Sequence, residues 1–235
     1  MQIDLIGFDA DDTLWQTEVH YLQAQRSLGK ILNQWESVEK INKILYEIEI
    51  NNLQRYGYGI KAFVLSMIET AIHISGGKVR GDQIEQILRI GTKMLDAEVI
   101  LQPHVRETLE HLSSTYRMMI LTKGDLLDQT KKVKRSGLAS FFFTVEVVND
   151  KTPETYARIL EKYRVSPENF LMIGNSIRSD VHPVLKLGGT AVYIPADTTW
   201  EHEIVSGFDT SQNGFYSLEH IGQLFALITK ISDAI

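Results

Sequence analysis

The sequence predicts an α/β fold in which a doubly wound parallel sheet is interrupted by an inserted block of helices. Short apolar runs rich in β-forming residues recur along the chain, segments with helical periodicity separate them, and residues 16–101 carry almost no strand signal. Fully apolar runs of this kind are typical of strands buried on both faces, as in parallel sheets covered by helices. We therefore expect a core domain of residues 1–15 and 102–235 and a helical domain of residues 16–101.

The predicted core alternates strands with helices whose ends carry recognisable signals. Thr152 followed by Pro153 is a favourable helix start, and Gly137 is typical of the position just past a helix end. In the inserted block, Asp82 is expected to cap a helix. The expected strands cover residues 3–8, 118–121, 142–148, 170–173 and 191–194, the expected core helices cover residues 105–113, 126–136, 153–163, 179–187 and 219–231, and residues 196–213 are expected to be a loop.

Composition and charge exclude several classes of protein. The net charge of −6 argues against non-specific nucleic-acid binding, which needs a basic surface. The chain has no cysteine, which excludes disulfides, thiolate metal sites and thiol nucleophiles. Aspartates interrupt the apolar residues near the N-terminus, so no signal peptide is predicted, and no segment is long and apolar enough to cross a bilayer. We expect a cytoplasmic protein without nucleic-acid or membrane partners.

Three carboxylates follow the first predicted strand within four residues. They belong to Asp9, Asp11 and Asp12. Like charges this close repel, and burying them without a positive partner is costly. A carboxylate cluster at the carboxyl end of a buried strand suits a divalent metal ion and a covalent phosphoryl acceptor. Asp12 is expected to have a turn or capping role rather than a catalytic one.

Polar side chains follow the other predicted strands at equivalent places. Thr122 and Lys123 come after the second strand, Lys151 after the third, and Asn175 and Asp180 after the fourth. In parallel α/β sheets the ligand lies beyond the carboxyl ends of the strands. We therefore expect these residues to form one site together with the aspartates of the first strand.

These residue types supply the parts that phosphoryl transfer needs. Asp9 is a candidate carboxylate nucleophile, and Asp11 is a candidate general acid and then base. Lys151 can neutralise both the nucleophile and the transferring phosphoryl group. The hydroxyl of Thr122 and the backbone amides of Lys123 and Gly124 can hold phosphate oxygens. The candidate ligands of an oxygen-only Mg²⁺ site are Asp9, Asn175 and Asp180.

Four motifs in order give the chain a family resemblance. Residues 9–13 (Asp-Ala-Asp-Asp-Thr) match the DxDxT motif of the haloacid dehalogenase (HAD) superfamily. Thr122 ends an apolar strand as in the second motif, and Lys151 matches the third. Residues 174–180 match the fourth motif in its longer GDxxxxD form. The chain thus resembles the phosphatase branch of this superfamily, with a helical C1-type cap inserted after the first motif.

The resemblance implies a Rossmann-like core and assigns roles to the motif residues. Asp9 would form an aspartyl-phosphate, while Asp11 would protonate the leaving group and then activate water. Mg²⁺ would be bound by Asp9, Asn175, Asp180 and the backbone carbonyl of Asp11. Asn175 departs from the family pattern, in which aspartate is more usual. Because an amide oxygen ligates without charge, we expect altered metal affinity.

The expected function is a Mg²⁺-dependent phosphatase, a phosphate-monoester hydrolase, acting on a small phosphorylated metabolite. A phosphomutase uses the same motifs and is not separated from it. The founding dehalogenases lack the second aspartate of the first motif, so Asp11 favours phosphate over a 2-haloacid substrate. A receiver-like signalling protein would carry its phosphorylated aspartate after a later strand, and only Asn175 suggests a non-catalytic binding protein. The expected assembly is a monomer or a homodimer.

Basic residues gather toward the end of the predicted helix 126–136. They are Lys131, Lys132, Lys134 and Arg135. Cations are favourable near a helix C-terminus, so we expect a solvated face here rather than a nucleic-acid patch. At the other end of this helix, Asp125 is expected to be the N-cap.

Overall fold

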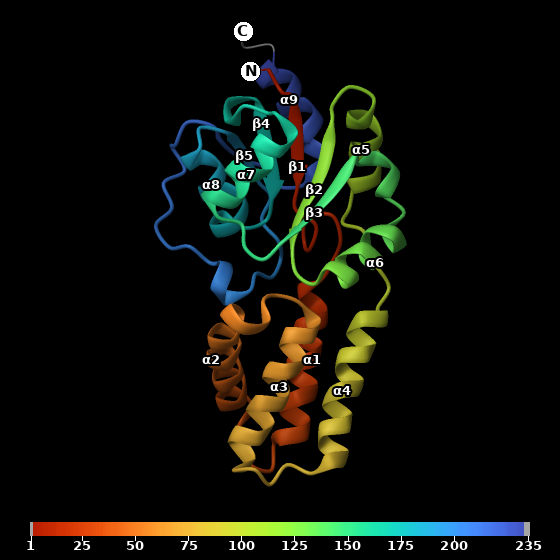
Figure 1. Cartoon of the computed structure of the whole chain (residues 1–235), viewed down its shortest axis with the longest axis vertical. Coiled ribbons are helices and arrows are strands. Elements are labelled where there is room, and N and C mark those ends of the chain that lie inside the picture. The colour runs from red at the N-terminus through yellow and green to blue at the C-terminus, as the bar shows by residue number, and fades with distance from the viewer. Residues whose placement is uncertain (1, 233–235) are drawn as a thin grey trace. The chain divides into compact units, whose positions relative to one another are not determined.

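The computed structural model of the chain describes residues 2–232, which form two compact units (Figure 1). The α/β unit contains residues 2–16, 99–123 and 129–232, and the helical unit contains residues 17–98 and 124–128. In the described residues, the α/β unit packs around two clusters of buried apolar side chains and the helical unit around another.

The α/β unit contains a parallel sheet of six strands in the order β3-β2-β1-β4-β5-β6. From β1 the chain builds outward through β2 and β3, and it then returns to place β4 on the other side of β1. The order therefore reverses between β1 and β4, and such a reversal opens a crevice at the carboxyl ends of the strands. The strands are β1 (Leu5–Phe8), β2 (Met118–Lys123), β3 (Thr144–Val148), β4 (Phe170–Gly174), β5 (Thr190–Tyr193) and β6 (Phe215–Ser217).

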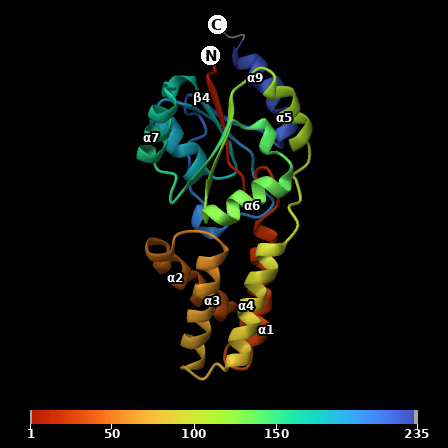
Figure 2. The same ribbon diagram turned by 45° about the vertical axis from the view of Figure 1, so that its right-hand side comes forward.

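Helices cover both faces of this sheet, as the predicted doubly wound fold requires. Successive residues of a strand point to opposite faces, so Leu5 and Ile6 of β1 belong to different apolar clusters. Figures 1 and 2 show α7 on one side of the strands and α5 and α9 on the other. One cluster packs under α5 (Val105–Ser113), α6 (Leu126–Ser136) and α9 (Leu224–Ser232), and the other under α7 (Pro153–Tyr163) and α8 (His182–Lys186).

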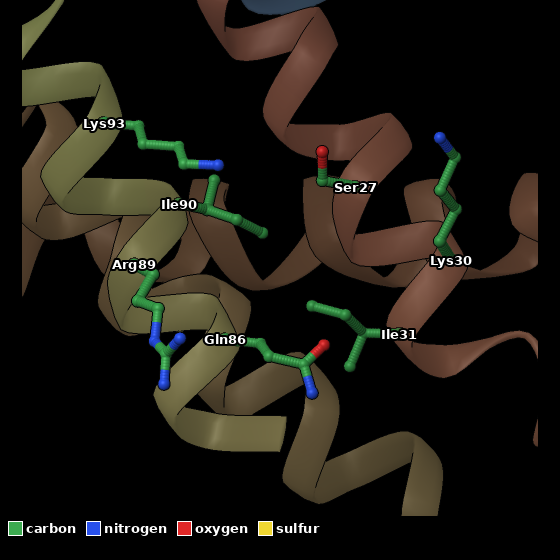
Figure 3. Close-up of a pocket in the computed structure, with 7 residues that line it drawn as sticks. All are labelled: Ser27, Lys30, Ile31, Gln86, Arg89, Ile90 and Lys93. Atoms are coloured by element: carbon green, nitrogen blue, oxygen red, sulfur yellow. The ribbon is translucent and has the colours of Figure 1, made fainter. Parts of the chain in front are cut away.

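The helical unit buries its apolar residues between four helices. They are α1 (Glu18–Leu32), α2 (Val38–Tyr56), α3 (Ile60–Ser75) and α4 (Gly81–Asp96). A groove of about 330 Å³ between α1 and α4 is lined by Ile31 and Ile90 together with Arg89 and Lys93. Figure 3 shows Ile31 on α1 and the other three residues on α4. None of the helices in residues 2–232 combines the length and the apolarity that a membrane crossing requires.

Several expected helix ends are confirmed. Thr152 caps α7 by accepting a hydrogen bond from the Thr155 amide at 3.3 Å, and Asp125 caps α6 by accepting one from the Asp128 amide at 3.0 Å. Asp82 is wrong as a cap, because α4 begins at Gly81. There the Gln83 side chain accepts a hydrogen bond from the backbone amide of Arg80 at 3.1 Å.

Other differences lie where the sequence signals are short. The expected strand 142–148 begins only at Thr144, after a turn of 3₁₀ helix at Ala139–Phe141. The expected helix 179–187 is a turn of π-helix, Ile177–Val181, followed by the short α8. Strand β6 is missing from the sequence prediction, since only three residues at the edge of the sheet form it.

Candidate active site

The candidate site lies at the carboxyl ends of β1 and β4, where the strand order reverses. Asp9 directly follows β1, and its amide donates a hydrogen bond to the Ile173 carbonyl of β4 at 2.8 Å. This bond continues the β1–β4 ladder by one residue and fixes the backbone of Asp9. The Asp9 side chain is buried, with 7% of the residue exposed. The fold therefore presents Asp9 as a buried carboxylate on a fixed backbone at the carboxyl ends of β1 and β4.

Lys151 lies between two of the predicted carboxylates. Its ammonium nitrogen is 2.6 Å from Asp9 Oδ1 and 2.6 Å from Asp180 Oδ1, and Lys151 itself is only 3% exposed. Burial opposes the charge of Lys151, but Asp180 and Asp9 outweigh it, so the pKa of Lys151 lies above its ordinary value. The structure thus brings together residues that are 142 and 29 positions from Lys151 in the sequence.

Two carboxylates facing one ammonium leave the site short of positive charge. Burial raises the pKa of Asp9 to about 7, and the nearby carboxylates of Asp180 and Asp11 add to the rise, although Lys151 opposes it. A cation beside Asp9 would reverse this effect by stabilising the ionised carboxylate.

A glycine and a π-helical turn hold Asp180 against the end of β4. A Cβ at Gly174 would lie 2.2 Å from the carboxyl carbon of Asp180, so only glycine allows this approach. The Asp180 Oδ2 accepts a hydrogen bond from the Ser176 amide at 3.0 Å. The buried Tyr156 hydroxyl of α7 donates a hydrogen bond to the Ser179 carbonyl at 3.0 Å, which links the π-helical turn to α7. Asp180 is therefore fixed through both of its oxygens.

The Thr13 hydroxyl brings the Asp9 and Asn175 side chains to one point. Thr13 Oγ1 is 3.0 Å from Asp9 Oδ2 and 3.2 Å from Asn175 Oδ1. The Asp9 oxygen near Thr13 is Oδ2, whereas Lys151 contacts Oδ1. An oxygen-only donor set suits Mg²⁺. Within residues 2–232 no group of three or more histidine or acidic side chains is arranged as a metal site. The oxygens that lie near Thr13 belong to a carboxylate and a side-chain amide.

Side chains from the loop after β1 and from α6 donate hydrogen bonds to the Asp11 carboxylate. Oδ1 accepts from the Trp15 indole at 2.9 Å and lies 3.1 Å from the Lys132 ammonium, while Oδ2 accepts from the Gln129 amide at 2.7 Å. The expectation of a solvated Lys132 is wrong, because the residue is only 8% exposed and its ammonium faces Asp11. Lys131, Lys134 and Arg135 are exposed as expected.

The second-motif residues have different surroundings. Thr122 is buried at the end of β2, and its hydroxyl donates to the Lys123 carbonyl at 3.3 Å. The Lys123 ammonium lies 2.5 Å from Glu203 Oε1 and 2.8 Å from Ser179 Oγ. Burial alone would raise the pKa of Glu203, but Lys123 and two serine hydroxyls lower it to about 2. Gly124 has a φ of 130° and begins the segment that groups with the helical unit.

The family follows from a comparison with known sequences. The sequence profile of the haloacid dehalogenase-like hydrolases matches residues 3–183, which include all four motifs. The chain belongs to this family. Membership makes it a hydrolase, and it agrees with the resemblance that the strand-end motifs indicate.

Relatives of this hydrolase differ in how much of it they match. Glyceraldehyde 3-phosphate phosphatase of Pyrococcus furiosus is 30% identical over 97 residues, which are 39% of this chain and 40% of the relative. The chain thus matches less than half of that relative's length. A haloacid dehalogenase-like family hydrolase from Xanthomonas campestris has a TM-score of 0.89 and 35% identity, covering 99% of this chain and 93% of its own.

A 2-haloacid dehalogenase from Pseudomonas syringae shares the fold alone. Its structure covers 98% of this chain and 100% of its own, with a TM-score of 0.64 and 20% identity. Hydrolases of different chemistry therefore share this architecture, and the choice between them depends on side chains at the site.

Sequence reasoning misses three polar residues of this hydrolase that touch the motif residues. Gln129 and Lys132 lie on α6 in register with the buried Val133 and Ser136, at the spacing of a helix face directed inward. That spacing is a usable signal for both. Glu203 comes from the long polar segment after β5, where no periodicity marks a buried position.

Proposed function

We propose that this hydrolase is a Mg²⁺-dependent phosphatase that cleaves the phosphate monoester of a small metabolite through an aspartyl-phosphate. The observation that carries the proposal is the placement of Asp9 against Lys151, with a second carboxylate, Asp11, two residues further on. A carboxylate nucleophile, a cation beside it and a separate proton donor are the parts of phosphoryl transfer. The phosphatase activity named for the relative from P. furiosus supports the same choice.

In the proposed first step, a carboxylate oxygen of Asp9 attacks phosphorus. The bond between phosphorus and the ester oxygen breaks, and the carboxylic acid form of Asp11 gives its proton to that oxygen as the alcohol leaves. Lys151 offsets negative charge on the nucleophile and on the phosphoryl oxygens. The Thr122 hydroxyl holds a phosphoryl oxygen once it turns from the Lys123 carbonyl, and the Lys123 and Gly124 amides hold others.

In the proposed second step, water hydrolyses the acyl phosphate. The carboxylate of Asp11 takes a proton from water as the water oxygen attacks phosphorus. The bond between phosphorus and the Asp9 oxygen breaks, so that inorganic phosphate leaves and Asp9 returns as a carboxylate. Asp11 ends the cycle protonated and ready for the next ester.

The proposed Mg²⁺ ligands include the two side-chain oxygens that lie near the Thr13 hydroxyl. The ligands are the carboxylate of Asp9, the amide oxygen of Asn175 and the backbone carbonyl of Asp11, with Asp180 acting directly or through a water molecule. When bound, the ion would supply the positive charge that two carboxylates and a phosphate lack beside Lys151 alone.

The proposed substrate is a small phosphorylated metabolite. The relative from P. furiosus is named for a three-carbon sugar phosphate, which makes short sugar phosphates the first class to test. The proposal retains a cytoplasmic enzyme, monomeric or homodimeric, without a nucleic-acid partner.

Phosphate release from a panel of esters tests the proposal. The purified chain with millimolar MgCl₂ should release inorganic phosphate repeatedly from at least one small ester. Asp9→Asn should lower that turnover by at least about 10³-fold and leave the fold intact, because an amide cannot form the acyl phosphate. Chloride release from 2-chloropropionate in place of phosphate release would instead establish a dehalogenase. Unchanged phosphatase turnover in Asp9→Asn would contradict the mechanism.

A further inference from the structure

The α6 side chains around Asp11 are arranged to fix the orientation of one carboxylate. We propose that Gln129 and Lys132 are positioning residues that hold Asp11 for its two proton transfers. Neither belongs to the four motifs, and the inference rests on the proposed phosphatase function. Three features of the contacts around Asp11 carry it.

The two ends of the Gln129 side-chain amide have different surroundings. Its Nε2 donates to Asp11 Oδ2 at 2.7 Å and to the Lys123 carbonyl at 3.1 Å, whereas its Oε1 is buried without a hydrogen-bond partner. Reversing the amide would turn an oxygen toward two acceptors, so the contacts determine its orientation. A buried acceptor without a partner costs free energy. This unfavourable burial occurs at a residue whose amide nitrogen donates a hydrogen bond to Asp11.

Lys132 is buried, whereas the two other lysines of α6 are exposed. Lys131 and Lys134 are exposed, whereas Lys132 directs its ammonium to Asp11 Oδ1 at 3.1 Å. Removing a lysine from water is costly, and an ion pair with good geometry is needed to offset that cost. One turn of helix separates Gln129 from Lys132, so a single rigid element supplies donors to both oxygens of Asp11.

Trp15, which lies in the same loop after β1 as Asp11, also holds this carboxylate. Its indole donates to Asp11 Oδ1 at 2.9 Å, and its ring is 1% exposed within the apolar cluster under α5 and α9. A buried indole has little freedom to move. Trp15 and Lys132 contact Oδ1, and Gln129 contacts Oδ2. Donors from the loop after β1 and from α6 thus fix the orientation of the Asp11 carboxylate together.

The dependence of rate on the leaving group tests this inference. An alkoxide leaving group needs a proton from Asp11, whereas p-nitrophenolate departs as a stable anion and needs little help. The value of kcat/KM reports steps up to release of the alcohol, so hydrolysis of the common acyl phosphate does not contribute to it. We therefore compare kcat/KM for p-nitrophenyl phosphate with kcat/KM for the best alkyl phosphate of the ester panel.

The variants Lys132→Met and Gln129→Met should lose activity selectively. We expect kcat/KM to fall about 10–100-fold for the alkyl ester and less than about 3-fold for p-nitrophenyl phosphate, since general acid catalysis contributes about 10²–10⁴-fold. Asp11→Asn should show the same selectivity with a larger loss. Lys132→Arg, which keeps the charge, should recover part of the alkyl-ester activity. Lys131→Met and Lys134→Met are the matched controls and should leave both values unchanged.

The outcomes separate the two proposals. A wild-type protein that cleaves neither ester overturns the proposed function, and the inference falls with it. A wild-type protein that cleaves both, with variants that lose the two esters equally or lose neither, overturns the inference alone. Thermal unfolding identifies a variant that fails to fold. Gln129→Met replaces one neutral side chain with another of similar length, so it provides the test if Lys132→Met does not fold.

Discussion

Carboxylates with raised pKa values occur in both units, but their surroundings differ. In the α/β unit, Asp9 has a pKa of about 7 and contacts both the Lys151 ammonium and the Thr13 hydroxyl. In the helical unit, Glu49 of α2 has a pKa of about 8 because burial and the carboxylate of Glu18 both disfavour its charge. The charged form of Asp9 is stabilised by neighbouring polar groups. The pKa of Glu49 is raised by burial and by repulsion from Glu18.

The difference shows that a shifted pKa does not by itself mark a catalytic site. Burial raises the pKa of any carboxyl group, and many such groups have no chemical role. Asp9 is distinguished by what converges on it, namely a cation, a hydroxyl and the ends of two strands. Changing the partners of each carboxylate should therefore have different consequences in the two units.

The largest effect is expected from removing the cation that serves the site. Lys151→Met leaves Asp9 and Asp180 buried face to face, and breaking a buried pair in this way costs about 3–5 kcal/mol of unfolding free energy. Urea unfolding at pH 7 measures this loss, and phosphatase turnover should disappear with it. The double variant Lys151→Met with Asp180→Asn should recover part of the stability but none of the turnover. A single variant as stable as the wild type would contradict this account of Lys151.

A smaller effect of opposite sign is expected at Glu49. Its folded-state pKa of about 8 lies above the ordinary 4.5, so the folded chain binds more protons than the unfolded chain between these values. The stability that the neutral group provides is therefore complete below pH 4.5 and is lost as the pH rises to about 8. Glu49→Gln should stabilise the chain by about 2–4 kcal/mol above pH 8 and by little near pH 5.

Thermal unfolding between pH 5 and pH 9 checks the Glu49 prediction. Glu47→Gln is the matched control, since Glu47 is exposed on the same helix and should leave the pH profile unchanged. If the Glu49→Gln and wild-type profiles stay parallel across this range, the carboxyl of Glu49 does not titrate as described.

The sequence predicts the sheet well because its strands are apolar on both faces. Runs such as 118–121 and 170–173 are so apolar that a buried strand is the favoured structure. Because parallel strands end at the same edge of the sheet, the polar residues that follow them are predicted to lie at that edge. The same logic fails for β6, whose three residues are partly exposed and follow a long polar segment. It also fails for the π-helical turn at Ile177–Val181, since no residue pattern separates that turn from an α-helix.

Within the site, the sequence reveals residues that follow strands and misses those that arrive from elsewhere. Asp9, Lys151 and Asp180 come together because parallel strands share their carboxyl edge. Lys132 is mistaken for a solvated residue because a lysine near a helix end is usually exposed, and its partner Asp11 is 121 positions away. Long-range pairs of this kind depend on packing that no local pattern contains.

The smallest effect is expected at Asn175, where one atom changes. Asn175→Asp adds a carboxylate near Asp9 without adding a cation. Two carboxylates would then repel each other there, as those of Glu49 and Glu18 do in the helical unit. Without Mg²⁺ the variant should be less stable, because like charges would share the Thr13 hydroxyl.

With Mg²⁺ the added charge becomes favourable, and we expect the dissociation constant for Mg²⁺ to fall about tenfold, equivalent to about 1.4 kcal/mol. Calorimetric titration with MgCl₂ measures this change, and Asn149→Asp, at an exposed asparagine after β3, is the control for a general gain of negative charge. An unchanged titration would mean that residue 175 does not bind the ion directly, and the proposed Mg²⁺ site would then depend on Asp9, Asp180 and backbone oxygens.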